Sequence, residues 1–270
     1  GLIWEEIQKI EKVPYQDFVY DLTINNSNHN FIANTFVVSN CGMRLLVSDY
    51  TEKEIQTYLE DLATEIQKEV PSGLGKGRKV KIDFAALDKI LKNGARALVE
   101  AGYGEKEDIE NCEASGALGW ADPATVSERA KNRGRDQVGT LGSGNHFLEI
   151  QKVDQIFNPE VAKTFGLFEG QVVVMIHTGS RGLGHQIASD YIRIMMQAMD
   201  KYGIRLPDRE LAACPINSSE GQRYFSAMAC GANYAWANRQ MIAHYIRKAW
   251  KKVLGENASS LKCLYDVAHN

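Results

Sequence analysis

The dipeptide Asn40-Cys41 divides the 270-residue chain into two parts of different character. Residues 18–40 (FVYDLTINNSNHNFIANTFVVSN) are typical of a compact β-rich segment that stops at an asparagine. The side-chain amide of Asn40 can attack its own carbonyl carbon, which closes a succinimide and releases the next residue. The thiolate of Cys41 is a strong nucleophile that can carry an acyl group meanwhile. The pair predicts a backbone that can break between residues 40 and 41, the alternative being an ordinary hairpin and linker.

The segment before the junction resembles the C-terminal end of an intein, through VYDLTI, NHNFIAN, an apolar run and then Asn40 and Cys41. The resemblance implies that residues 1–40 are the tail of a self-excising insert and that residues 41–270 belong to its host. Inteins usually carry a histidine just before the final asparagine, where this chain has Ser39. His29 lies one hairpin earlier and is expected to serve in its place.

Composition points to a globular protein with no membrane partner. Hydrophobic residues make up 44% of the chain, enough for a core, and no apolar run reaches the roughly 18 residues of a membrane span. Five cysteines occur without a CxxC pair, so a reducing cytoplasm is expected rather than a disulfide framework. Five of the 34 acidic and two of the 31 basic residues fall in residues 1–40, which leaves the remainder neutral and without an overall charge for nucleic-acid binding.

Residues 41–270 alternate helical and strand-like patterns. Helices are predicted from a capping box at Thr51 and Glu54 to near Pro71, over about 83–102, after Gly184, and over about 219–255. Strands are predicted over residues 147–153, 172–176 and 262–268, and residues 103–143 are expected to be mostly loop. This order indicates an α+β or an α/β domain, of which we adopt α+β.

Four basic side chains gather before a glycine-rich turn, namely Arg129, Lys131, Arg133 and Arg135. Their spacing favours a solvated loop, with a nucleic-acid contact as the alternative.

Three of the six histidines lie at the edge of a strand-like apolar run. His146 opens HFLEI, His177 closes VVVMIH, and His269 closes CLYDVAH. Because strand ends meet at one rim of a sheet, where ligands usually bind, these imidazoles and the Cys41 thiolate form a candidate metal site. The four groups could hold one ion or, if the thiolate bridges, part of a two-metal site. Taken singly, each histidine is better explained as a satisfied polar residue, and only their shared placement supports the metal-ligand interpretation.

Two glycine-rich turns adjoin these histidines. Residues 139–146 (GTLGSGNH) and 177–185 (HTGSRGLGH) bring flexible backbone next to a strand or helix end, although neither is a P-loop or a GxGxxG motif. Arg181 within the second turn favours a phosphate or oxyanion contact. His185 and His244 lack the strand-end placement, and His244 is expected on the surface.

Four motifs, CGMRLL, RGRDQVGTLGSGNHFLE, VVVMIHTGSRGLGH and YDVAHN, resemble the RtcB family of RNA ligases over nearly all of residues 41–270. The resemblance implies a mixed sheet with packed helices and an enzyme of tRNA splicing and RNA repair. Such an enzyme joins a 2′,3′-cyclic-phosphate or 3′-phosphate end to a 5′-hydroxyl end. It uses GTP and manganese, through a guanylated histidine. Genes of the family are also known hosts of inteins inserted just before this cysteine.

The resemblance implies a role for each matching residue. Cys41 would bridge two manganese ions, with His146 on the first ion and His177 and His269 on the second. The guanylate site would be lined by Asn145, His146, Phe147, Leu148, Glu149, His269 and Asn270. Arg181 would contact an RNA end or a phosphate. Ligand softness alone favours zinc, so manganese follows from the resemblance only.

Two departures from the family pattern change what the chain is expected to do. An aspartate ligand precedes the cysteine by three residues in the family, whereas this chain has Val38, so the ligand would arrive from upstream after splicing. The guanylated histidine lies beyond YDVAHN, so the ligase nucleophile is expected outside this chain. The isolated chain is therefore expected to be an inactive ligase fragment. Its other candidate functions are protein splicing at Asn40 and Cys41, which needs upstream intein and extein segments, or non-catalytic metal or RNA binding.

Overall fold

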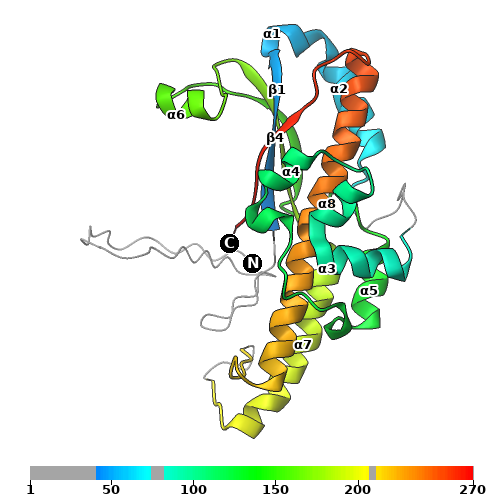
Figure 1. Ribbon diagram of the computed structural model, residues 1–270, viewed down its shortest axis with the longest axis vertical. Helices are drawn as coiled ribbons and strands as arrows, with labels where there is room; N and C mark the ends of the chain where they lie inside the picture. The colour runs from blue at the N-terminus through cyan, green and yellow to red at the C-terminus, as the bar shows by residue number, and fades with distance from the viewer. Residues whose placement is uncertain (1–40, 74–81, 207–210, 270) are drawn as a thin grey trace, which may run out of the picture.

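A four-stranded sheet with long helices packed against one face forms the framework of the domain (Figure 1). The computed structural model describes residues 41–73, 82–206 and 211–269. The α+β class expected for residues 41–270 is confirmed. The resemblance implied a mixed sheet, but every strand pair among the described residues is antiparallel. The segment predicted over residues 1–40 and the predicted break at Asn40 lie outside the described residues.

The strands are ordered β2-β3-β1-β4 across the sheet. They span β1 (Cys41–Thr51), β2 (Phe147–Lys152), β3 (Gln171–Gly179) and β4 (Lys262–His269). The predictions of the last three strands are confirmed, with β3 longer than expected. Strand β1 was not predicted, because it is an inner strand buried on both faces and lacks the alternation of a half-buried strand.

The register of the strands sorts their side chains onto two faces. Successive side chains of a strand point to opposite faces, and Cys41 pairs with His269 across β1 and β4. Met43, two residues after Cys41, pairs with His177 of β3, so these three candidate ligands share one face. Arg44 and Asp266 pair on the opposite face, which packs against the longest helix.

Several helices begin at a recognisable side-chain cap. The predicted capping box joins Thr51 and Glu54, although the helix after it is broken into α1 (Glu52–Ile55), the 3₁₀ turn η1 (Gln56–Tyr58) and α2 (Leu59–Glu69). Asp83 accepts a hydrogen bond from the Ala86 backbone N–H at 2.7 Å and begins α3 (Phe84–Glu100). The remaining long helices are α7 (Arg181–Tyr202) and α8 (Ser219–Leu254).

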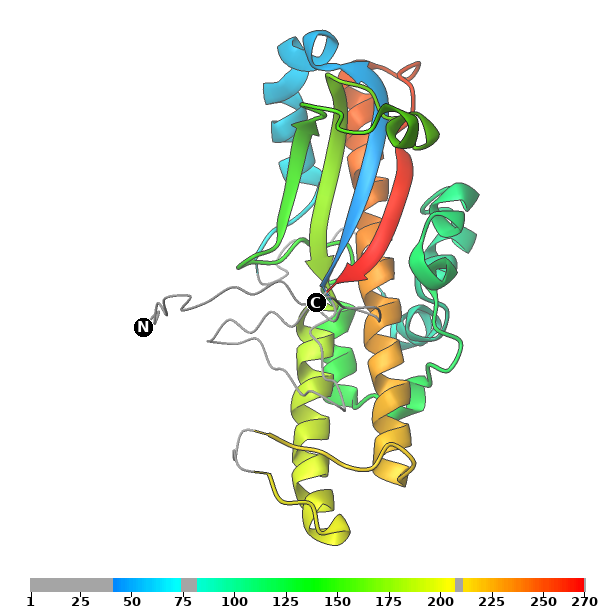
Figure 2. The ribbon, with the colours of Figure 1, turned by 90° about the vertical axis from the view of Figure 1, so that its left-hand side faces the viewer.

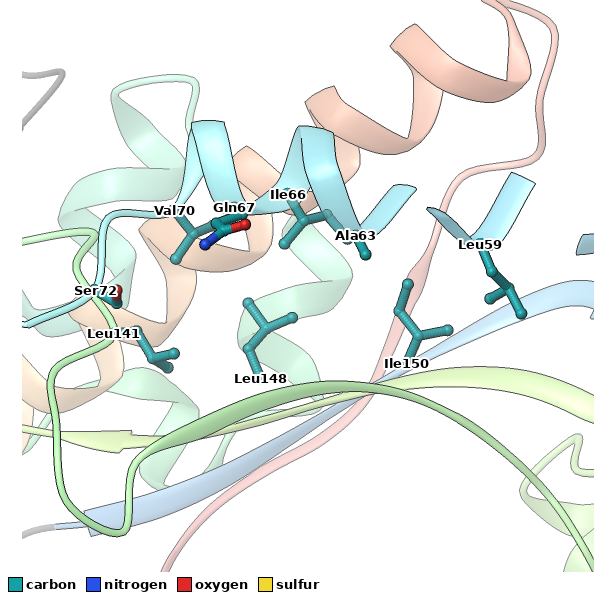
Figure 3. Close-up of a pocket in the computed structure, with 9 residues that line it drawn as sticks. All are labelled: Leu59, Ala63, Ile66, Gln67, Val70, Ser72, Leu141, Leu148 and Ile150. Carbon is teal, nitrogen blue, oxygen red and sulfur yellow. The ribbon is translucent and has the colours of Figure 1, made fainter. Parts of the chain in front are cut away.

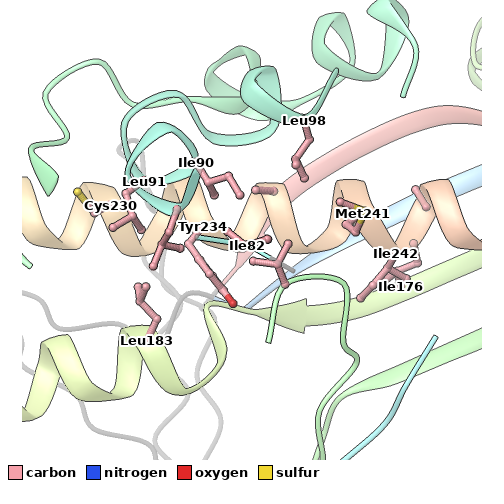
Figure 4. Packing of buried hydrophobic residues seen from close by; sticks show 14 of the residues in the cluster. Ile82, Ile90, Leu91, Leu98, Ile176, Leu183, Cys230, Tyr234, Met241 and Ile242 are labelled. Carbon is pink, nitrogen blue, oxygen red and sulfur yellow. The ribbon is translucent and has the colours of Figure 1, made fainter. Parts of the chain in front are cut away.

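The core lies between the sheet, α3, α7 and α8 (Figure 4). Helix α8 is 36 residues long and crosses the centre of the domain, and most residues of its middle turns are buried. Trp250 is fully buried, and the buried Tyr234 hydroxyl donates to the Gly134 carbonyl at 2.7 Å. Burial of this helix fixes which of its polar side chains can reach the sheet.

Residues 103–143 are more helical than predicted. They contain α4 (Lys106–Glu110), the 3₁₀ turns η2 (Glu113–Gly116) and η3 (Pro123–Thr125), and α5 (Glu128–Arg135). The four basic residues therefore lie on or at the end of a helix and not on a loop, because the Ser127 hydroxyl caps α5.

Two details of the helices differ from what the sequence predicted, and one short helix completes the fold. Helix α7 begins at Arg181, four residues before the expected start after Gly184. His244 is half-buried and makes an edge contact with Tyr103, so its expected surface position is wrong. The short helix α6 (Pro159–Thr164) lies away from the other helices (Figure 1). Within the described part of the chain, no helix is long and apolar enough to cross a membrane.

Candidate metal centre at one end of the sheet

The four candidate ligands come together at one end of the sheet. At this end β1 begins and β3 and β4 end, as the ribbon in Figure 2 shows. Cys41 opens β1 and faces His269, the last residue of β4. His177 lies two residues before the end of β3, and His146 immediately precedes β2. The structure thus brings one thiol and three imidazoles together at one rim of the sheet.

The ligands are arranged as two close pairs. Cys41 Sγ lies 3.8 Å from His146 Nε2, and His177 Nε2 lies 2.7 Å from His269 Nε2. The rings of His146 and His177 are 6.1 Å apart between centroids, which places the pairs side by side. Among the residues that the structure describes, no three histidines, cysteines or acids yet enclose a space for an ion.

His177 is held in the orientation of a metal ligand. Its Nδ1 lies 2.7 Å from the Asn145 backbone carbonyl, which can only accept, so Nδ1 carries the proton. The lone pair is then on Nε2, the atom that faces His269. The ring also stacks on Phe147 at 5.0 Å. A ligand histidine commonly donates its second N–H in this way, which fixes its tautomer.

His146 is kept neutral by its surroundings. Burial, the nearby charge of Arg181 and the neighbouring His177 lower the pKa of His146 to about 4. Arg181 Nη1 lies 3.5 Å from His146 Nδ1, and its Nη2 donates to the Gly73 carbonyl at 2.7 Å. Gly142 has φ +105°, and a Cβ there would collide with both Arg181 and His146. A glycine is thus required at residue 142, where the turn contacts Arg181 and His146.

His269 is also biased toward its neutral form, because burial, His177 and Arg239 lower its pKa. Neutral imidazoles with directed lone pairs and a half-buried thiol suit a divalent transition metal. The chemistry of these donor groups therefore fits a divalent cation, although their spacing among the described residues does not enclose one.

The residues expected to line a guanylate site do not all lie on the same face of the sheet. Asn145 and Glu149 are exposed, and Phe147 lies beside His177. Leu148 points the other way and lines, with Ile150, an apolar pocket of about 530 Å³ between β2 and α2 (Figure 3). Asn270, like Asn40, lies outside the described residues.

A smaller hollow of about 190 Å³ lies beside Cys41. Trp236 and Arg239 of α8 line it together with Ala268 of β4. The Trp236 indole N–H is buried and lacks a hydrogen-bond partner. This hollow adjoins the candidate ligands, whereas the larger pocket beside Leu148 does not.

Sequence reasoning missed a buried charged group directly behind the ligands. Asp266 of β4 is fully buried and pairs with Arg44 of β1 at 2.7 Å and with Arg239 of α8 at 2.6 Å. An arginine inside the apolar run CGMRLLVS was a signal that a buried acidic partner exists. It did not tell which acid or which helix supplies the partners.

Comparison with known proteins agrees with the placement of these motifs. A family model described as tRNA-splicing ligase RtcB matches residues 16–270. The tRNA-splicing ligase RtcB of Pyrococcus furiosus is 52% identical over the whole chain, and that of Methanocaldococcus jannaschii is 51% identical; this chain covers 28% of each. The protein of the same name from Methanococcus maripaludis is 54% identical over 86% of this chain, which covers 48% of it.

The chain thus spans less than half the length of these relatives. The matched region includes all four candidate ligands and every described strand and helix. The chain therefore belongs to the RtcB family of tRNA-splicing ligases.

Proposed function

We propose that the completed protein joins RNA ends, a 2′,3′-cyclic-phosphate or 3′-phosphate end to a 5′-hydroxyl end, as in tRNA splicing and RNA repair. The observation that carries this proposal is the convergence of Cys41 and three histidines at one end of the sheet. The partners are RNA and GTP, and we place the protein in the reducing cytoplasm because a thiolate ligand is most secure there.

The chain's own residues would hold two divalent ions, which we take to be manganese. Cys41 lies between His146 and His269, which supports its proposed role as a ligand that the two ions would share. His177 presents Nε2 because Asn145 fixes its other nitrogen. When bound, the cations would offset the negative charge that develops during phosphoryl transfer.

Phosphate recognition falls to the residues around the turn before β2. Arg181 is anchored through its Nη2 to Gly73, which leaves its guanidinium beside His146 for an RNA end. The exposed Asn145 and Glu149 would contact the guanylate on the open face. The guanylated histidine is proposed to lie in the part of the relatives that this chain does not span.

The test uses a completed protein that contains this chain. RNA with 3′-phosphate and 5′-hydroxyl ends is incubated with GTP and Mn²⁺, and joining is followed by denaturing electrophoresis. Wild type is expected to join the ends, and Cys41→Ala and His177→Ala are expected to lose joining. Equal joining by Cys41→Ala would refute the proposed metal chemistry.

A second proposed function concerns the junction at Asn40. The 274 matched residues are 28% of the P. furiosus protein and the 233 matched residues are 48% of the M. maripaludis protein, so the first relative is about twice as long. The longer relative matches the whole chain, whereas the shorter one leaves 14% unmatched, a share close to that of residues 1–40. We propose that an inserted segment before Cys41 in the longer relatives accounts for this difference, which is consistent with these lengths.

Cleavage at the junction would then follow from Asn40 cyclisation. Mass spectrometry of the purified chain after warming is expected to detect a fragment that begins at Cys41. Its absence under all conditions would remove the support for an intein over residues 1–40.

A further inference from the structure

A buried polar cluster lies on the face of the sheet opposite the candidate ligands. It joins Arg44 of β1, Asp266 of β4 and Arg239 of α8, each at most 1% exposed. Charged groups this deeply buried are retained only where their hydrogen bonds are made, so the cluster holds its three elements in one arrangement.

Arg239 makes the contacts that reach toward the ligands. Its Nε and Nη2 lie 2.8 Å and 2.6 Å from Asp266 Oδ1, and its Nη1 donates to the Thr178 carbonyl at 2.8 Å. Arg44 Nε donates to the other Asp266 oxygen at 2.7 Å. One guanidinium therefore ties β3 and β4 to helix α8.

The same guanidinium lies against the backbone of β1. A Cβ at Gly42 would come within 2.7 Å of Arg239 Cζ and 2.6 Å of the Val267 carbonyl oxygen. Only a glycine at residue 42 leaves space for this approach. Arg239 is thus in close contact with β1, β3 and β4 at once.

Each of these contacts is next to a candidate ligand. Gly42 follows Cys41, Thr178 follows His177, and Asp266 lies three residues before His269. We propose that Arg239 is a positioning residue, which holds the three strand ends at the spacing at which Cys41, His177 and His269 bind a divalent cation. The proposal rests on the proposed metal centre and adds a residue that acts from behind it.

Helix α8 supplies a matched control for the effect of losing a buried arginine. Arg247 lies eight residues after Arg239 and makes two hydrogen bonds of 2.6 Å to Asp108. It also donates to the Leu261 carbonyl at 2.8 Å, just before β4 begins and at the end opposite His269. Removing it also breaks a buried charge pair of α8, but its own hydrogen bonds lie away from the ligand ends of the strands, and Asp108 reaches Arg44 only through Gln240.

The experiment compares Arg239→Met, Arg239→Lys and Arg247→Met in the full chain. Thermal unfolding reports on the fold, and titration with Mn²⁺, followed by the electron paramagnetic resonance of the free ion, gives the affinity. Titration with Co²⁺ adds a sulfur-to-metal absorption band that reports on Cys41. Arg239→Met is expected to weaken Mn²⁺ binding roughly 10–100-fold and to diminish the Co²⁺ band.

The two other variants separate positioning from general stability. Arg239→Lys keeps a charge opposite Asp266 but cannot donate to Thr178 as well, so a smaller loss of affinity is expected. Arg247→Met is expected to lower the melting temperature while leaving the Mn²⁺ affinity within about twofold of wild type. If Arg239→Met does not fold, Gly42→Ala replaces it, because its Cβ displaces the guanidinium and keeps every charge.

Failure of the positioning role and failure of the metal centre would give different results. Wild-type affinity in Arg239→Met or in Gly42→Ala would overturn the positioning role, and so would an equal loss in Arg247→Met. The proposed metal centre fails instead if wild type binds no divalent cation, or if Cys41→Ala binds the cation as tightly as wild type.

Discussion

The ion pair between Asp108 of α4 and Arg247 of α8 should make the stability of the domain depend on pH. Burial alone would raise the pKa of Asp108, but the two hydrogen bonds and the charge of Arg247 lower it to about 2, from an ordinary value of 3.8. At about 1.4 kcal/mol for each pH unit, this difference is worth about 2 kcal/mol. Because Asp108 is 1% exposed, solvent does not screen the pair.

A carboxylate with a lowered pKa stabilises the fold above its unfolded pKa, and this contribution is lost as the pH falls through the folded value. The variant Asp108→Asn removes it. The free energy of unfolding of wild type should exceed that of the variant by at least about 2 kcal/mol more at pH 6 than at pH 2, with most of the change between pH 4 and pH 2.

Urea unfolding of wild type and Asp108→Asn between pH 6 and pH 2 measures the difference in their free energies of unfolding. Glu52→Gln is the control, because Glu52 and Lys152 form a pair at 3.1 Å that is exposed and screened by solvent and therefore contributes little. A difference between wild type and Asp108→Asn that stays constant with pH would refute the reasoning.

Three further outcomes are expected. Asn40→Ala should abolish the fragment that begins at Cys41, and equal cleavage of wild type and variant would sink the cyclisation mechanism. In a completed, spliced protein, elemental analysis should find both ions lost in Cys41→Ala but mainly one lost in His146→Ala or His177→Ala; full occupancy in Cys41→Ala would rule out bridging. The isolated chain with Mn²⁺ and α-labelled GTP should give no labelled band on a denaturing gel, and a surviving label would show that a nucleophile lies within it.

The sequence predicted most elements because their signals are local. The capping box at Thr51 and the apolar period of α8 are read from neighbouring residues. Strand β1 was missed because an inner strand has no polar face to reveal its period. Helix α5 was missed because Ser127 caps only eight residues with few apolar side chains, and packing against α7 stabilises it.

The residues of the candidate site can also be separated into those that the sequence predicted and those that it did not. His146, His177 and His269 were found because each lies at a strand edge, and strand edges meet. The support behind them was not found, because Arg239 reaches Asp266 only through the packing of α8 on the sheet. The geometry of the pairs, including the 2.7 Å approach of two imidazole nitrogens, likewise depends on register rather than on sequence pattern.

The central claim is that Cys41, His146, His177 and His269 hold divalent cations. Crystals of the chain grown with Mn²⁺ and measured at the manganese absorption edge test it most directly. The expected result is anomalous density within bonding distance of Cys41 Sγ and of the facing Nε2 atoms of His177 and His269. Anomalous density confined to other parts of the molecule, with these four side chains unliganded, would contradict the claim.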